Sequence, residues 1–173
     1  IGVSPNTSII DSHLDCNNGI LVNEYCETSI PDVYAAGDCT KWPYHINNEI
    51  IRVEHWDHAI NHARTAATNM LNPKTTIYST IPYFWSNQHH LSIQYLGHPT
   101  KWDSTVLRGN IHDDKFTLFY IFENRVVGAL IINEPRNVLP IRKLIKLNVP
   151  VDNRELRDQE NDLRKVVKRL SVS

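Results

Sequence analysis

The chain has 173 residues, of which 41% are hydrophobic and 21% charged, with a net charge of −1 and a mean hydropathy of −0.37. This composition is typical of a globular protein and excludes the disordered and collagen-like classes. The longest apolar runs, such as residues 126–132, are far shorter than the ~18–20 residues of a membrane-spanning helix, and the net charge gives no reason to expect nucleic acid as a partner.

Charge is distributed unevenly along the chain. Residues 1–40 contain six acidic side chains and no Lys or Arg, whereas residues 141–173 contain nine basic and five acidic side chains. The basic C-terminal region either docks an acidic partner or is a solvated helix face. The three cysteines lack C-x-x-C and metal-ligand spacing, which favours free thiols in a reducing compartment. The chain begins at Ile1, without a Met or a signal peptide, which suggests a fragment or a processed product.

The first half of the chain predicts short strands followed by one helix. Strands are expected at Ile9-Ile10, at residues 20–22 and at residues 33–36, with turns between them. From Trp56 the hydrophobic period changes from two to 3.6, which predicts a helix that ends at Asn72-Pro73. The buried face expected for this helix is rich in alanine and consists of Trp56, Ala59, Ile60, Ala63, Ala66, Ala67 and Met70.

The second half predicts an antiparallel sheet followed by helices. Residues 91–96 alternate like a half-buried strand, while residues 116–122 and 126–132 are apolar on both faces and are joined by a tight turn, which indicates a hairpin. Residues 138–147 form a helical stretch before Pro150, and Asp152-Asn153 is expected to cap a last, charged helix that runs to Leu170.

The most specific local pattern is the segment from Thr28 to Asp38, with the sequence TSIPDVYAAGD. It describes a turn that feeds a short buried strand of small residues, so that the backbone at Gly37 can approach a ligand closely. Asp38 would then stand at the carboxyl end of the strand, where a carboxylate accepts hydrogen bonds from ligand hydroxyls. By composition alone, an ordinary Gly-Asp turn explains the same pattern.

This segment resembles the second FAD-binding motif of the pyridine-nucleotide-dependent flavoprotein reductases, in which the Asp holds the ribityl chain. Residues 1–6 resemble the segment by which that family's chain re-enters its FAD domain, and residues 19–23 resemble the strand that follows. The resemblance therefore implies that Gly37 and Asp38 bind FAD.

Two further segments resemble the ferredoxin-reductase and apoptosis-inducing-factor branch of that family. Residues 52–59 are similar to its helix entry beside the pyrimidine end of the flavin, where free amides favour the negative charge that builds on reduction. Residues 82–88 are similar to its Phe-Trp-Ser-Asp-Gln signature, with Asn87 in place of Asp. The flavin surroundings implied by the resemblance are Glu54, His55, Trp56 and Trp85. The alternatives are simple core packing for the two tryptophans, a helix N-terminal carboxylate that complements the dipole for Glu54, and a satisfied surface imidazole for His55.

The six glycines contain no G-x-G-x-x-G loop, although the family needs one for FAD and one for NAD. We therefore expect the C-terminal part of a longer reductase, inactive on its own, that lacks its N-terminal FAD and NAD domains. The fold expected is α+β: a partial FAD-binding, Rossmann-like domain in residues 1–78, an antiparallel sheet-plus-helix interface domain in residues 79–150, and a charged helical tail in residues 151–173.

The function implied by the resemblance is electron transfer from NAD(P)H through FAD to an iron–sulfur acceptor of ferredoxin or Rieske type, with no covalent catalyst in this chain. An intracellular setting, cytoplasmic or mitochondrial, is expected. Two alternatives stay open. One is a non-catalytic interaction module with a vestigial flavin site. The other is a metal site at His58 and His62, which are four residues apart on the predicted helix, although the Glu of an H-E-x-x-H motif is absent.

Overall fold

The computed structural model describes residues 2–8 and 14–172, in two compact units, Ile1–Thr80 (unit 1) and Ile81–Ser173 (unit 2). The sequence-based division set residues 151–173 apart, whereas in the structure they group with unit 2. The strand expected at Ile9-Ile10 lies outside the described residues. Within the described ranges, no helix has the length and apolar character needed to cross a membrane.

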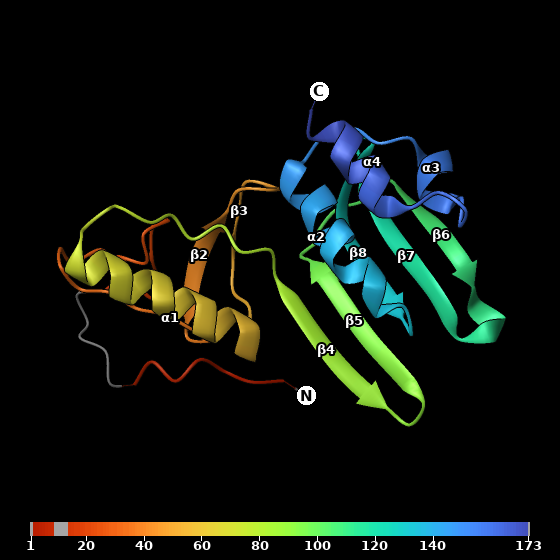
Figure 1. Ribbon diagram of the computed structural model, residues 1–173. Coiled ribbons are helices and arrows are strands. Elements are labelled where there is room, and N and C mark those ends of the chain that lie inside the picture. Colours follow the sequence, from red (N-terminus) through yellow and green to blue (C-terminus); the bar gives the residue numbers. More distant parts are fainter. Residues whose placement is uncertain (1, 9–13, 173) are drawn as a thin grey trace. The chain divides into compact units, whose positions relative to one another are not determined.

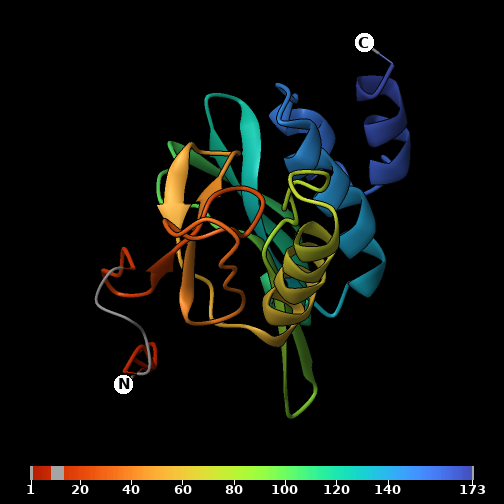
Figure 2. The ribbon, with the colours of Figure 1, turned by 90° about the vertical axis from the view of Figure 1, so that its left-hand side faces the viewer.

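Unit 1 contains a small three-stranded sheet and one long helix (Figures 1 and 2). β1 (Ile20–Leu21) pairs in parallel with β2 (Thr40–Tyr44), and β2 pairs antiparallel with β3 (Glu49–Ile51). α1 (Trp56–Leu71) packs on β2, where the ring of Trp42 contacts two histidine rings of the helix. β1 and α1 confirm the expected strand and helix, while β2 and β3 were not anticipated.

The strand expected at residues 33–36 is wrong. Only Tyr34 makes a bridge, to Glu27, and Val33 is exposed. Its backbone hydrogen bonds run from Thr28 N to Val33 O, from Val33 N to Ile30 O and from Ala35 N to Cys26 O. A strand needs a continuous ladder on at least one edge. Among the described residues, a bridge partner for this segment is found only at Glu27, so no continuous ladder forms and the segment is not a strand.

The buried face expected for α1 is also wrong. Ala63, Ala67 and Met70 are exposed, as is Trp56. The buried face of α1, which packs on the rest of unit 1, is instead mostly polar. It comprises His58, His62, Thr65, Ala66 and Asn69. Hydrogen bonds make this burial possible: the amide of Asn69, for example, donates to Tyr25 O and Thr76 O and accepts from the backbone N–H groups of Thr75 and Thr76. Apolar periodicity does not detect a face of this kind.

Unit 2 is built on a five-stranded antiparallel sheet with the order β4-β5-β8-β7-β6. The strands are β4 (Tyr83–Gln88), β5 (Leu91–Gly97), β6 (Ser104–Asn110), β7 (Lys115–Phe122) and β8 (Arg125–Ile132). The predicted hairpin of β7 and β8 is confirmed. Its two turn residues, Glu123 and Asn124, have φ values of 48° and 60°, as a twist-matched two-residue turn requires.

Helices cover one face of this sheet. α2 (Val138–Leu147) lies over β5 and β8, α3 (Asn153–Arg157) contacts β6, and α4 (Leu163–Leu170) packs on α2 (Figure 1). A single-turn 3₁₀ helix precedes α2 at Pro135–Asn137, and another joins β6 to β7 at Ile111–Asp113. The core between helices and sheet is largely apolar, with Leu96, Phe119, Ala129, Ile131, Ile141, Ile145, Leu156 and Leu163 almost completely buried.

The single last helix expected from Asp152-Asn153 to Leu170 is wrong, because two helices occupy this region. Asp152 caps α3 as expected, and Asp162 caps a separate α4. Between them, the buried guanidinium of Arg108 on β6 donates to the carbonyls of Leu156, Asp158, Gln159 and Asn161. Carbonyls that accept from a side chain on the sheet have left the i to i+4 ladder, and the chain therefore turns here before α4.

Candidate functional site

The Gly37-Asp38 turn lies immediately before β2 rather than at the end of a strand. Gly37 is buried with φ +89°, a conformation that favours glycine. Its carbonyl accepts from the backbone N–H of Thr40 at 3.0 Å and from the Thr40 hydroxyl at 2.7 Å. Asp38 is exposed, and no described residue is seen to donate a hydrogen bond to its carboxylate. The Asp38 carboxylate is therefore available to a ligand.

The start of α1 lies against this turn. A Cβ placed on Gly37 would be 3.6 Å from the Cβ of Ala59, in the first turn of the helix. His55 is the N-cap, with Nδ1 accepting from the backbone N–H of Asp57 at 3.3 Å, and Trp56 follows with 65% of its surface exposed. The N-terminal turn of the helix is thus close to Gly37, and Trp56 is not a core residue of unit 1.

Arg52 connects two of the residues expected at the site. Its guanidinium pairs with the carboxylate of Glu54 and donates to the carbonyl of Asp38 at 3.4 Å. The aliphatic part of Arg52 lies beside Gly19, where an added Cβ would meet Arg52 Cδ at 3.0 Å. The structure therefore brings Gly37, Asp38 and Glu54 together in unit 1, through an arginine that the motif analysis did not single out.

Two buried histidines stand behind the turn. Burial lowers the pKa of His58 to about 4, although the Asp38 carboxylate and the Gly37 backbone favour the protonated ring. Burial, with a smaller effect of His58, lowers the pKa of His62 to about 3. Both rings are therefore neutral near pH 7.

The metal alternative at His58 and His62 finds no support. Among the residues that the structure describes, no three His, Cys, Asp or Glu side chains are grouped as metal ligands. Nδ1 of His58 is 2.8 Å from the hydroxyl of Tyr78, and Nδ1 of His62 accepts from Gly37 N. The two rings pack between Trp42 and Tyr78, so they belong to a hydrogen-bonded aromatic core.

Trp85 belongs to the other unit. It lies on β4, is 41% exposed, and stacks on Tyr83 with ring centroids 5.6 Å apart. Asn87, which stands where the resembling signature has Asp, pairs with Ser92 in the β4-β5 hairpin.

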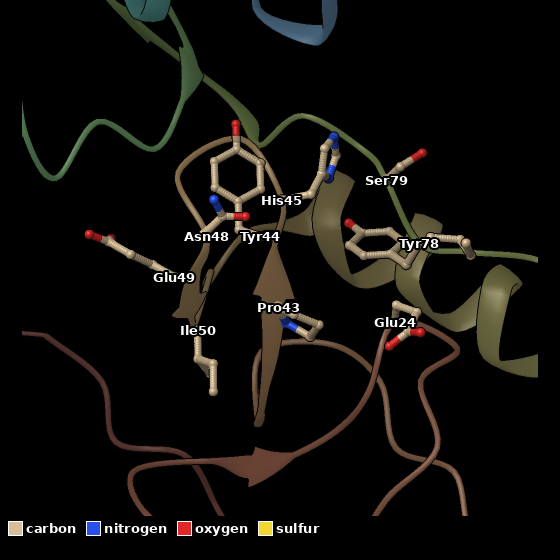
Figure 3. Close-up of a pocket in the computed structure, with 10 residues that line it drawn as sticks. Glu24, Pro43, Tyr44, His45, Asn48, Glu49, Ile50, Tyr78 and Ser79 are labelled. Carbon is tan, nitrogen blue, oxygen red and sulfur yellow. The ribbon is translucent and has the colours of Figure 1, made fainter. Parts of the chain in front are cut away.

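A separate cavity of about 580 Å³ opens in unit 1 (Figure 3). It lies beside β2 and β3, and Pro43, Ile50 and Glu24 project around it in the close-up. Its other lining residues are Tyr44, His45, Asn48, Glu49, Ile77, Tyr78 and Ser79. None of the six site residues proposed from the sequence lines it.

Two protein families match consecutive parts of the chain. Residues 1–66 match the family described as pyridine nucleotide-disulphide oxidoreductase, and residues 83–167 match the family described as reductase C-terminal. The first unit is thus similar to the pyridine nucleotide-disulphide oxidoreductases, and the second unit is similar to a reductase C-terminal domain.

Particular relatives are ferredoxin-type reductases. The chain is 31% identical over 170 residues to rhodocoxin reductase of Rhodococcus erythropolis, covering 98% of this chain and 40% of that protein. It is 28% identical to putidaredoxin reductase of Pseudomonas putida, covering 96% and 40%. Among solved structures, the covalent putidaredoxin reductase–putidaredoxin complex matches with a TM-score of 0.91 at 26% identity, over 99% of this chain and 41% of that one. The chain thus spans about two-fifths of the length of these relatives.

Proposed function

We propose that this chain is the C-terminal part of a flavoprotein reductase that passes electrons from NAD(P)H through FAD to an iron–sulfur protein. Members of its family use FAD and NAD(P)H. The observation that carries the proposal is the exposed Asp38 carboxylate on a turn that Gly37 holds against the start of α1. These are the groups that a ribityl chain and a flavin ring need.

The residues present fit a flavin. Asp38 would accept hydrogen bonds from the ribityl hydroxyls, and Gly37 at φ +89° lets the backbone come close without a side chain. The amides and dipole at the start of α1 would favour negative charge at the pyrimidine end of the ring. Bound FAD would supply the exchange between two-electron hydride chemistry and one-electron transfer.

The remaining site residues have supporting roles in this proposal. Glu54 is held by Arg52, so it would shape the polar rim of the site rather than move freely. His55 caps the helix and so orients its first turn. Trp56, at 65% exposure, offers an aromatic surface for the flavin or the nicotinamide path. The same role for Trp85 rests on the resemblance alone and stays a prediction.

The electron acceptor proposed is an iron–sulfur protein, because the relatives are named as ferredoxin-type reductases and one solved neighbour is a complex with putidaredoxin. A ferredoxin fits the names of these relatives. A Rieske-type acceptor, or a closer tie to the apoptosis-inducing-factor branch, is the finer prediction. An intracellular setting, cytoplasmic or mitochondrial, agrees with the free thiols of Cys16, Cys26 and Cys39.

The test uses the complete reductase that contains this chain. We expect the purified protein to carry FAD, the flavin absorbance to bleach on anaerobic addition of NADH or NADPH, and the reduced protein to reduce a ferredoxin in a stopped-flow assay. Flavin that binds but is not bleached by either nucleotide would favour the interaction module. The absence of flavin together with about one equivalent of zinc would favour the metal site.

A further inference from the structure

The backbone of Gly37 is held from two sides by buried polar side chains. Its N–H donates to Nδ1 of His62 at 3.2 Å, and its carbonyl accepts from the Thr40 hydroxyl at 2.7 Å. His62 and Thr40 are both 0% exposed, and Thr40 Oγ1 is itself 3.2 Å from His62 Nδ1. These three residues come from α1, the turn and β2, so the contact joins all three parts of the candidate site.

The hydrogen-bond direction defines the state of the imidazole. Because the Gly37 amide can only donate, Nδ1 of His62 must carry a lone pair, and the ring proton is on Nε2. The low pKa of His62, about 3, keeps the ring in this neutral form over the ordinary pH range. A protonated ring would instead place an N–H against the N–H of Gly37.

We propose that His62 is a positioning residue, which holds the Gly37-Asp38 turn in the conformation that presents the Asp38 carboxylate to the flavin. This inference rests on the proposed function for the identity of the ligand. His62 does not contact the ligand in this scheme; it acts through the backbone of Gly37, and Asp38 follows directly in the chain. Without the acceptor, the buried amide of Gly37 would lose its partner and the turn would relax toward other conformations.

Two substitutions at position 62 distinguish the loss of the hydrogen-bond acceptor from a change in side-chain volume. In His62→Leu a methyl group takes the place of Nδ1, so the shape is kept and the acceptor is lost. In His62→Asn the amide oxygen stands the same number of bonds from Cα as Nδ1 does, so the acceptor is restored. Thr65→Val is the matched control, because Thr65 lies on the same buried face and its hydroxyl donates to the Asn61 carbonyl within the helix.

The first readout needs no flavin. In the 173-residue chain, the amide exchange of Gly37 measured by NMR should quicken at least about tenfold in His62→Leu and stay near the wild-type value in His62→Asn and Thr65→Val. Imidazole ¹⁵N shifts in the wild-type chain should show a neutral ring protonated at Nε2. Unchanged exchange in His62→Leu, or a ring protonated at Nδ1, would overturn the inference whatever the ligand.

The second readout is flavin affinity in the complete reductase. We expect the FAD dissociation constant to rise about fivefold to tenfold in His62→Leu, the size of one net hydrogen bond, and to recover in His62→Asn. Thr40→Val is the substitute if His62→Leu folds poorly, because it removes the second contact to Gly37. The FAD dissociation constant should rise in this variant too. Equal FAD affinity in wild type, His62→Leu and Thr40→Val would overturn the inference alone. A wild-type protein without flavin would overturn the proposed function as well.

Discussion

The imidazole of His58 stacks on the indole of Trp42, with ring centroids 5.8 Å apart and an angle of 17° between the planes. His62 lies one turn further along α1, 4.8 Å from His58 between centroids, and neither side chain is more than 2% exposed. Unit 1 therefore encloses two histidines in an aromatic core. Enclosure of this kind makes folding sensitive to acid, since the folded chain resists protonation and the unfolded chain does not.

The first prediction concerns pH. The two histidines have pKa values of about 4 and about 3 in the folded chain and ordinary values near 6.5 when unfolded. Their contribution is complete above pH 6.5 and is lost as pH falls from there through the folded values. Between these limits the unfolded chain binds the extra protons, so the free energy of unfolding should fall by about 1.4 kcal/mol per pH unit for each histidine.

Urea denaturation between pH 7 and pH 4.5, followed by tryptophan fluorescence, measures this slope. In His58→Asn the slope of the free energy of unfolding against pH should decrease by about 1.4 kcal/mol per pH unit, the contribution of one histidine. The control is His90→Gln, which removes an exposed histidine of unit 2 that pairs with Asp114 and leaves unit 1 untouched. A slope that is the same in His58→Asn and in wild type would show that the buried ring is not responsible.

The second prediction concerns Asp38. In the complete reductase, Asp38→Asn should weaken FAD binding roughly tenfold to a hundredfold, because hydrogen bonds to a charged acceptor contribute about 1.5–3 kcal/mol. Flavin-to-protein absorbance after dialysis and a fluorescence titration give the affinity. Asp32→Asn is the control: Asp32 is also exposed and on the same segment, and its φ of 64° is one that Asn tolerates. Equal losses in both variants would remove Asp38 from the site.

The third prediction concerns the backbone at Gly37. Gly37→Ala should lower the free energy of unfolding of unit 1 by about 1–2 kcal/mol, because φ +89° is unfavourable for an L-residue. Steric clash is not the reason, since the added Cβ would sit at an ordinary 3.6 Å from Ala59. Gly2→Ala, which has nothing within 4 Å of the added Cβ, should leave stability unchanged in the same chemical denaturation experiment. An unaffected Gly37→Ala would mean that the turn adapts freely.

The fourth prediction concerns Arg108 in unit 2. Arg108→Met should reduce the free energy of unfolding by at least about 3 kcal/mol, because four carbonyls between Leu156 and Asn161 lose their donor. Differential scanning calorimetry and amide exchange of residues 156–161 measure the global and the local effect. Arg154→Met, which breaks an exposed ion pair with Asp152, is the control and should leave the transition where it is. Protection of the 156–161 amides that survives in Arg108→Met would contradict the assigned role.

The sequence was sufficient for elements that depend on neighbouring residues. The helical period from Trp56 to Asn72, the hairpin turn at Glu123-Asn124 and the caps at Asp152 and Asn72-Pro73 are all local patterns, and the structure has α1, β7, β8 and α3 at these places. The motif ending at Gly37-Asp38 also identified the family, because a string of residue types at fixed spacing does not require knowledge of the fold.

What depended on distant partners was missed. The polar face of α1 is buried because Asn69 finds carbonyls near Tyr25 and His62 finds the amide of Gly37, 25 residues away. The last helix is divided because Arg108 reaches carbonyls about 50 residues further along the chain. A pattern of apolar residues predicts which side of a helix prefers to avoid water. Only the tertiary structure decides which polar groups are satisfied when buried, because each needs a partner that the chain supplies from elsewhere.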